Sequence, residues 1–244
     1  MPRRLVRVAL GLAGIGALVG ATVIADAIVR SEMERIAREE IAVAMQLDDP
    51  DEVEAEIEGG SAIVQLLLGS VDHVAITVAD LDLGVADGTF HAEIYDLPTN
   101  PLTPIPRVYS YISLDHESVL QLTGEFVDAP VTDVSLQPPA LRVELTTTLP
   151  SQATPSRVTV VVEPVTRGSR IVLVPQSIEV GAAVLAPSAF EERYGVSTST
   201  LFDQTGFCVA DSVPTTMEIA DVRVSNGAVL LVFAIEQRSV LQLQ

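Results

Sequence analysis

Histidine is the side chain best suited to acid–base catalysis near neutral pH, and this chain of 244 residues has three, His73, His91 and His116. His73 and His91 alternate with apolar neighbours, which is typical of strands, and His116 stands where a solvated helix would begin. Ser and Asp are abundant enough to complete a triad in space. However, the chain has no G-x-S-x-G or H-E-x-x-H motif, no phosphate-binding loop and no dinucleotide fingerprint. We therefore predict that the protein is not an enzyme and uses no cofactor.

Candidate metal ligands are concentrated in residues 48 to 58, where seven of eleven residues are acidic. Charged and apolar residues alternate from Asp51 to Glu58, which places the carboxylates on one wet face of a strand. The segment also lacks the Asp-x-Asp-x-Asp-Gly spacing of an EF-hand. The single cysteine, Cys208, lies in an apolar stretch and has no His at zinc-ligand spacing, so it is predicted to be a buried small side chain. No metal site is predicted.

Apolar side chains are in excess, since 48% of the residues are hydrophobic although only 4% are aromatic and Trp is absent. Residues 63 to 68, 158 to 162 and 229 to 235 are apolar nearly all round. A strand that is apolar on both faces is either buried on both sides or faces a ligand cavity. Both interpretations remain open on this ground.

The formal charge is −19, from 14 basic and 33 acidic residues, and every basic residue is an arginine. Residues 1 to 25 hold three arginines and no acid, so 11 arginines face 33 acids in the rest, a charge of −22. Such a domain repels phosphate polyanions, which excludes nucleic acid as a partner. It also has no basic patch for an anionic membrane, so any contact with lipid must use apolar surface.

Residues 1 to 25 have the pattern of an export signal. Arg3, Arg4 and Arg7 precede the uncharged residues 8 to 25, and Asp26 ends the apolar run. Eighteen uncharged residues just reach the length of a membrane-spanning helix, and Ala25-Asp26-Ala27 fits a cleavage site poorly. A cleaved signal peptide and a signal anchor that contacts the membrane through residues 8 to 25 both remain open. Because basic residues stay in the cytoplasm, we expect residues 26 to 244 in the cell envelope, on the outer side of the cytoplasmic membrane or secreted to the periplasm.

The remaining chain is predicted to be α+β. Apolar residues recur every three or four positions over residues 26 to 47, which predicts a helix that can continue from the membrane segment. Ser61 and Gly69 are typical of the two ends of a short helix over residues 62 to 68, and further short helices are expected at 113 to 122 and 187 to 194. Strand patterns occupy residues 51–58, 73–78, 81–85, 89–94, 131–136, 141–149, 157–165, 170–180, 217–224 and 228–236.

Residues typical of turns, bulges and loops between these strands predict how the strands connect. Asp87-Gly88 and Asn226-Gly227 are typical of hairpin turns. The apolar positions change from even to odd near Ala79-Asp80, which indicates a bulge. Residues 98 to 106 contain four prolines and must form a loop. Strands therefore follow one another as antiparallel pairs.

One segment reads Gly59-Gly60-Ser61-Ala62-Ile63-Val64-Gln65-Leu66-Leu67-Leu68-Gly69, followed by Val71-Asp72-His73-Val74-Ala75-Ile76. It resembles a signature of the LmeA-like proteins, a family of exported actinobacterial phospholipid-binding proteins. The helix after a membrane segment and the hairpin around Asn226-Gly227 are similar to that family as well, so the likeness covers most of residues 26 to 236. The family has Phe-Pro-Phe where this chain has Gly60-Ser61-Ala62, and two aromatic side chains near the expected lipid contact are thus absent.

The resemblance implies a long N-terminal helix packed in a strongly curved antiparallel sheet, as in tubular lipid-binding proteins, with an apolar groove. Together with the apolar content, it predicts that residues 26 to 244 form one domain that binds phospholipid, another acyl lipid or a lipid-linked precursor, for lipid transport or envelope glycan assembly. The predicted lipid-binding residues are Ile63, Val64, Leu66, Leu67, Leu68, Val74, Ile76 and Ile36. The alternative is a non-catalytic envelope scaffold with a fully packed core, and a weaker alternative is a hydrolase of envelope lipids.

Overall fold

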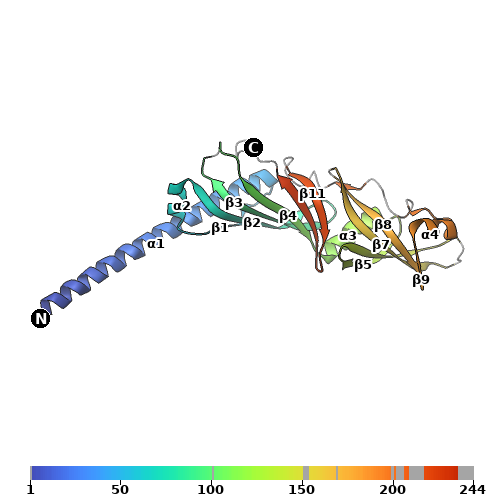
Figure 1. Cartoon of the computed structure of the whole chain (residues 1–244), viewed down its shortest axis with the longest axis horizontal. Helices are drawn as coiled ribbons and strands as arrows, with labels where there is room; N and C mark the ends of the chain where they lie inside the picture. The colour runs from blue at the N-terminus through green and yellow to red at the C-terminus, as the bar shows by residue number, and fades with distance from the viewer. Residues whose placement is uncertain are drawn as a thin grey trace. The chain divides into compact units, whose positions relative to one another are not determined.

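The computed structural model describes residues 2–100, 102–150, 154–168, 170–198, 201, 206–208 and 217–235, with side chains described from residue 23 to residue 234 of these ranges, except at Cys208. The described chain is α+β, with four α-helices, one 3-10 helix and twelve strands (Figure 1). The predicted fold class is therefore confirmed. The chain forms two compact units. Unit 1 contains the residues up to Ile76 and Glu93–Val108, and unit 2 contains Thr77–Ala92 and the described residues from Tyr109 onward.

Unit 1 begins with α1 (Pro2–Met45), one continuous helix, as predicted. A positive φ of 59° at Gln46 ends it, and the 3-10 turn Pro50–Glu52 leads into β1 (Val53–Glu58). Buried and exposed residues alternate along β1, so its carboxylates face water as predicted. α1 packs against β1, which confirms that the N-terminal helix lies on a sheet.

The predicted export segment, residues 1 to 25, lies almost wholly outside the residues whose side chains are described. Over the residues whose side chains are described, no helix combines the length and the apolar character needed to cross a membrane. The assignment of residues 26 to 244 to one lipid-binding domain stays a prediction.

The short helix α2 (Ala62–Leu68) has the predicted boundaries. The Ser61 Oγ accepts a hydrogen bond from the Val64 N–H at 3.3 Å, which satisfies one of the free donors of the first turn. Gly69 ends the helix with a φ of 84°, a conformation that glycine adopts without steric cost. Local sequence alone therefore determines where this helix starts and stops.

Two expectations about the next strands need correction. The pattern at 73–78 and the first two residues of the pattern at 81–85 belong to one strand, β2 (Ser70–Asp82), whose buried positions change parity around Asp80, where φ is 51°. The turn before β3 (Asp87–Pro98) comes at residues 83 to 86, where the Leu83 N–H donates to the Ala86 carbonyl. Asp87-Gly88 is therefore not a turn. Gly88 lies inside β3, and a side chain is excluded there because a Cβ would stand 2.7 Å from the Ile112 Cγ2.

The described strands form two antiparallel sheets. The first has the order β1-β2-β3-β4-β12-β11, with β4 (Arg107–Leu114), β11 (Met217–Val224) and β12 (Val229–Ile235). The second has the order β10-β8-β7-β6-β5, from β10 (Phe207–Cys208), β8 (Arg170–Val180), β7 (Ser156–Arg167), β6 (Ala140–Thr147) and β5 (Val131–Gln137), with β9 (Ala183–Leu185) beside β8. Each sheet is open at both ends. The predicted strong curvature is not found among these strands.

The core of unit 2 is aliphatic. Its fully buried side chains include Ile112, Leu114, Leu145, Ile178 and Leu231. Helix α3 (His116–Phe126) packs against β5, and α4 (Pro187–Tyr194) packs against β8 and buries Phe190 completely. The predicted start of α3 at residue 113 was wrong, because Ser113 and Leu114 end β4, and the helix extends four residues beyond the predicted end at residue 122. α4 has the predicted boundaries.

Candidate functional site

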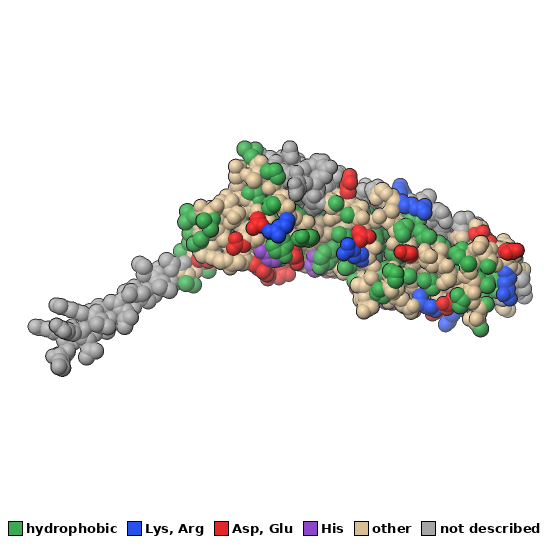
Figure 2. Space-filling view, in the orientation of Figure 1, with side chains coloured by type: hydrophobic (Ala, Val, Ile, Leu, Met, Phe, Trp, Pro, Cys, Tyr) green, Lys and Arg blue, Asp and Glu red, His purple; other side chains and the backbone are tan. Residues whose placement is uncertain are grey.

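Helix α2 presents apolar side chains to solvent. Leu67 and Leu68 are 82% and 78% exposed, and Val64 and Leu66 are 50% and 40% exposed. Figure 2 shows hydrophobic side chains gathered over this helix. Soluble proteins normally turn such a face inward, so this surface indicates contact with something apolar.

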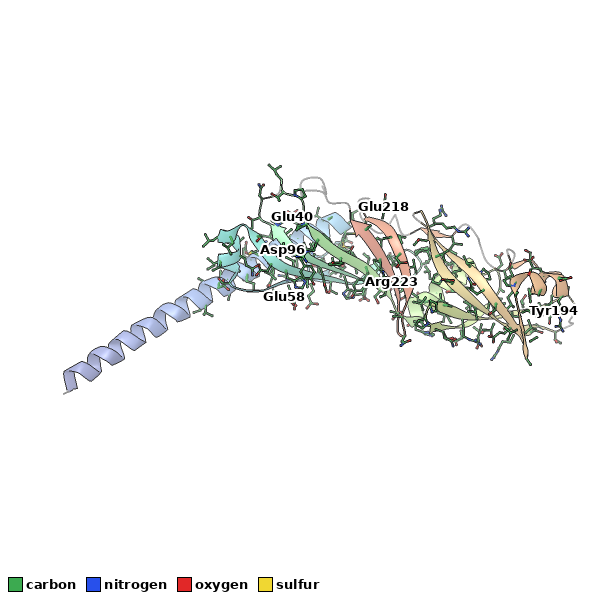
Figure 3. The ribbon with its side chains drawn as sticks, in the orientation of Figure 1. Glu40, Glu58, Asp96, Tyr194, Glu218 and Arg223 are labelled. Atoms are coloured by element: carbon green, nitrogen blue, oxygen red, sulfur yellow. The ribbon has the colours of Figure 1, made fainter. Side chains whose placement is uncertain are left out.

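The polar side chain of α2 points the other way. Gln65 is only 3% exposed. Its Nε2 donates to the carbonyls of Glu58 and Gly60 at 3.3 and 3.2 Å, and its Oε1 accepts from the Asp72 N–H at 2.8 Å. Three hydrogen bonds thus tie the inner side of α2 to the end of β1, where Figure 3 labels Glu58, and to the start of β2.

A second set of bonds joins α2 to α1. The Asp26 Oδ1 accepts hydrogen bonds from the Ser61 hydroxyl at 2.6 Å and from the Ile63 N–H at 3.1 Å. These two bonds, the Ser61 bond first, hold the pKa of the Asp26 carboxyl below its usual value. One turn further along α1, the Arg30 guanidinium donates to the Gly60 carbonyl at 2.6 Å and also to the Ile57 carbonyl. α2 is therefore fixed to α1 around residues 26 to 30.

The predicted lipid-binding residues fall into two groups. Val64, Leu66, Leu67 and Leu68 are exposed on α2, Ile63 there is half-buried, and Ile36 is 47% exposed on α1. Val74 and Ile76 are 3% and 6% exposed, so they belong to the buried face of β2. The structure thus gathers the α2 residues on one surface and keeps the β2 residues in the core, and their role in lipid binding stays a prediction.

Unit 2 contains an apolar cavity that sequence reasoning missed. Its volume is about 30 Å³, room for about one water molecule. Among the described residues that line it, Thr123 has the only polar side chain, and its hydroxyl already donates to the Val119 carbonyl at 2.6 Å. The lining residues come from α3 and seven strands: Leu114, Val119, Leu122, Thr123, Phe126, Leu141, Pro164, Ile171, Leu173, Phe207, Val222, Val229 and Leu231. A cavity with no free hydrogen-bonding side chain favours apolar occupants over water.

A second, polar pocket of about 290 Å³ lies in the same unit. It is lined by the carboxylates of Asp80, Asp87, Asp115 and Glu117 together with hydroxyl and amide groups. Asp115 is engaged as the cap of α3, and its bonds to Ser118, the backbone N–H first, lower the pKa of its carboxyl. The described part of the chain contains no cluster of His, Cys, Asp and Glu that could hold a metal ion.

The histidines are held by structural contacts. His73 stacks on Tyr95 with ring centres 4.4 Å apart, and its Nδ1 lies 3.0 Å from the Glu58 carboxylate. His91 stacks on Tyr111 at 4.9 Å. His116 is exposed, with its Nε2 3.8 Å from the Asp133 carboxylate.

Among the described residues, the three histidines contact Glu58, Thr77 and Asp133 and no serine hydroxyl, so this part of the chain shows no Ser-His-Asp triad. Cys208 is the second residue of β10 and pairs with Arg170 of β8, but its side chain lies outside the described side chains, so its burial stays a prediction.

Comparison with known proteins gives one match. A family model described as LmeA-like phospholipid-binding matches residues 21–234. This confirms the resemblance seen in the sequence. No curated protein and no solved structure matches the chain.

Proposed function

Because this chain belongs to the LmeA-like phospholipid-binding family, we propose that it binds phospholipid, or a lipid-linked precursor, on the outer side of the cytoplasmic membrane. Residues 1 to 25 export the domain and either anchor it or are removed. The protein acts by burial of acyl chains rather than by catalysis, and its role is lipid transport or envelope glycan assembly.

The observation that carries the binding mode is the apolar cavity of unit 2, whose lining offers no unpaired polar side chain. Each CH₂ group moved from water into such surroundings contributes about 0.8 kcal/mol. Several methylenes are enough to hold a lipid without any charged contact, which suits a chain whose acidic surface attracts no phosphate.

An acyl chain needs more room than about 30 Å³, so the lining must part to admit it. The wall that can part most readily contains Phe126 of α3 and Phe207 of β10, which meet edge to face with ring centres 5.9 Å apart. β10 has two residues, and among the described strands it pairs only with β8. Few backbone hydrogen bonds therefore resist its displacement, and we assign the entry of the acyl chain to this edge.

The competing function is an envelope scaffold with a fully packed core, which the small size of the cavity favours. The two functions differ in content: a lipid carrier isolated from its native envelope retains lipid, and a scaffold does not. The full chain should therefore be purified in detergent, extracted with organic solvent and examined by mass spectrometry for phospholipid in stoichiometric amount.

A matched pair of variants locates the site. Val222→Phe places a larger side chain in the cavity lining, and overpacking costs about 1–3 kcal/mol of stability. Val184→Phe makes the same exchange on β9, where the side chain is 66% exposed. The proposal expects the folded Val222→Phe protein to lose its lipid and Val184→Phe to keep it. Equal lipid in both would remove the cavity from the site, and no lipid in the parent protein would favour the scaffold.

Localisation is tested separately. A reporter that is active only outside the cytoplasm, fused after Gln244, should be active, and a cytoplasmic reporter at the same place should be silent. The reverse pattern would contradict export.

A further inference from the structure

We propose that α2 is a membrane-docking element whose exposed leucines, Leu67 and Leu68, insert into the outer leaflet of the phospholipid bilayer. This inference rests on the proposed function, because it takes residues 8 to 25 as the segment that reaches the membrane. It adds a second contact with lipid, on unit 1, that is separate from the acyl-chain cavity of unit 2.

Helix α2 is inverted relative to a normal surface helix, because its polar side chain is buried and its leucines are exposed. Residues 59 to 69 contain no charged side chain. The single polar side chain within α2, Gln65, is buried with three hydrogen bonds, whereas Leu67 and Leu68 are the most exposed residues of the helix. Exposure of such a surface to water costs free energy, whereas contact with the apolar part of a bilayer does not. Interfacial helices present this kind of face to lipid.

Backbone groups at both ends of α2 are hydrogen-bonded within the protein. The Ser61 hydroxyl accepts from the Val64 N–H and the Asp26 carboxylate accepts from the Ile63 N–H. At the other end, the Gly69 N–H donates to the carbonyls of Gln65 and Leu66 at 3.0 and 3.2 Å. Backbone groups that are paired within the protein can approach hydrocarbon without leaving an unmet hydrogen bond.

Helix α2 is bound to α1 at the point where the uncharged segment of α1 ends. Asp26 is the first charged residue after the uncharged residues 8 to 25, and it is the residue that binds Ser61 and Ile63. α1 runs without a break through this point. A membrane segment that ends at residue 25 therefore holds α2 level with the membrane surface, where leucines of a seven-residue helix can reach the lipid.

Charge supports an apolar mode of contact. The nearby Arg30 guanidinium is occupied by the carbonyls of Gly60 and Ile57. The residues after the export segment carry a formal charge of −22 and would be repelled by anionic headgroups. Docking through α2 should therefore occur on neutral phosphatidylcholine and should not require an anionic lipid.

The test uses the full chain with Cys208→Ala, so that one new cysteine can carry an environment-sensitive fluorophore. The probe site is Leu67→Cys, at a position that is 82% exposed. The matched control is Val43→Cys, 77% exposed on the same helix α1 that holds α2, but about 25 Å along the helix from Asp26 at 1.5 Å per residue. Each labelled protein is placed in phosphatidylcholine nanodiscs with and without quencher attached to the lipid chains.

The proposal expects a blue-shifted emission at position 67 that the lipid-attached quencher abolishes, and an unshifted, unquenched emission at position 43. An emission at position 67 that matches position 43 and is quenched by aqueous iodide would overturn it. A blue shift without lipid quenching would overturn it too, because a second copy of the chain or another protein would then cover α2.

The Leu67→Gln, Leu68→Gln double variant separates this inference from the proposed function. In a Cys208→Ala background with a probe at Val64→Cys, the double variant should lose lipid quenching while its co-purifying phospholipid stays at the parent level. Loss of the co-purifying lipid together with docking would show that α2 itself is the lipid site and would contradict two separate contacts. Absence of lipid from the parent, with lipid quenching at position 67 intact, would refute the cavity and leave the docking helix standing.

Discussion

Replacing Gln65 by Leu tests the physical basis of the inverted helix. Gln65 is 3% exposed and makes three hydrogen bonds, at 3.3, 3.2 and 2.8 Å. Leucine is of similar size and raises the helix propensity slightly, so a reader of the sequence alone would expect Gln65→Leu to be neutral or stabilising. The structure predicts the opposite, because the exchange leaves the partners of these bonds inside unit 1.

The magnitude follows from the bonds. Each contributes about 1 kcal/mol net, or about 3 kcal/mol for the three. The Gly60 carbonyl keeps its bond from Arg30, and the more apolar leucine recovers about 1 kcal/mol by burial. We therefore expect the free energy of local unfolding of α2 to fall by about 2 kcal/mol, which corresponds to a roughly 30-fold larger equilibrium constant for local unfolding.

Hydrogen exchange measured by mass spectrometry reads this change locally. Amides of residues 62 to 72 should exchange roughly 30-fold faster in Gln65→Leu, while those of β7 and β8 keep the parent rates. Gln121→Leu is the matched control, because Gln121 is an exposed residue of helix α3 and such changes stay within about 0.5 kcal/mol. Unchanged exchange over α2 in Gln65→Leu would refute the account given for the orientation of this helix.

Three further predictions concern stability. Leu67→Asp should lower the melting temperature by only about 1–2 °C, because a side chain that is 82% exposed loses about 0.5 kcal/mol of burial at most. A variant that is already unfolded at room temperature would instead show that Leu67 belongs to the core. Gly88→Ala should cost about 1–3 kcal/mol by calorimetry, since its Cβ would stand 2.7 Å from the Ile112 Cγ2, whereas Gly124→Ala, with nothing within 4 Å, should stabilise α3 by about 0.5–1 kcal/mol. The lowered pKa of Asp26 means that the unfolded chain binds its proton more tightly, so the contribution of this carboxylate is complete above its usual pKa of about 3.9 and is lost as the pH falls through the lower folded value. In Asp26→Asn, the protection of the α2 amides from hydrogen exchange should therefore depend less on pH in the acid range than in the parent protein. The same pH dependence in both proteins would contradict a stabilising role of the Asp26 carboxylate.

Local signals in the sequence predicted much of the secondary structure. Alternation of acid and apolar residues was enough for β1, and the pair Ser61 and Gly69 was enough for both ends of α2. These features depend on neighbours along the chain, because caps and strand faces are set within a few residues. The α+β class followed from the same signals.

Strand β4 was missed, and Gly88 was assigned to a turn, for a shared reason. β4 buries Ser110 together with Ile112 and Leu114, so a polar residue interrupts the apolar alternation that marks a strand. Gly88 is small because Ile112 and Leu114 pack against it from that neighbouring strand. Neither fact is visible without the pairing of strands, which the amino-acid pattern of one segment does not contain.

For the candidate site, the amino-acid sequence determined that residues 63 to 68 form an apolar helix with one glutamine, in a chain with a formal charge of −19. Only the tertiary structure decided which side of that helix is inside. Gln65 turns inward because carbonyls of Glu58 and Gly60 and the N–H of Asp72 converge there, and a buried amide must be paired. The leucines are left outside as a consequence. The cavity of unit 2 likewise depends on side chains between Leu114 and Leu231 that meet only when two sheets and α3 pack together, since packing is a property of the fold and not of any one segment.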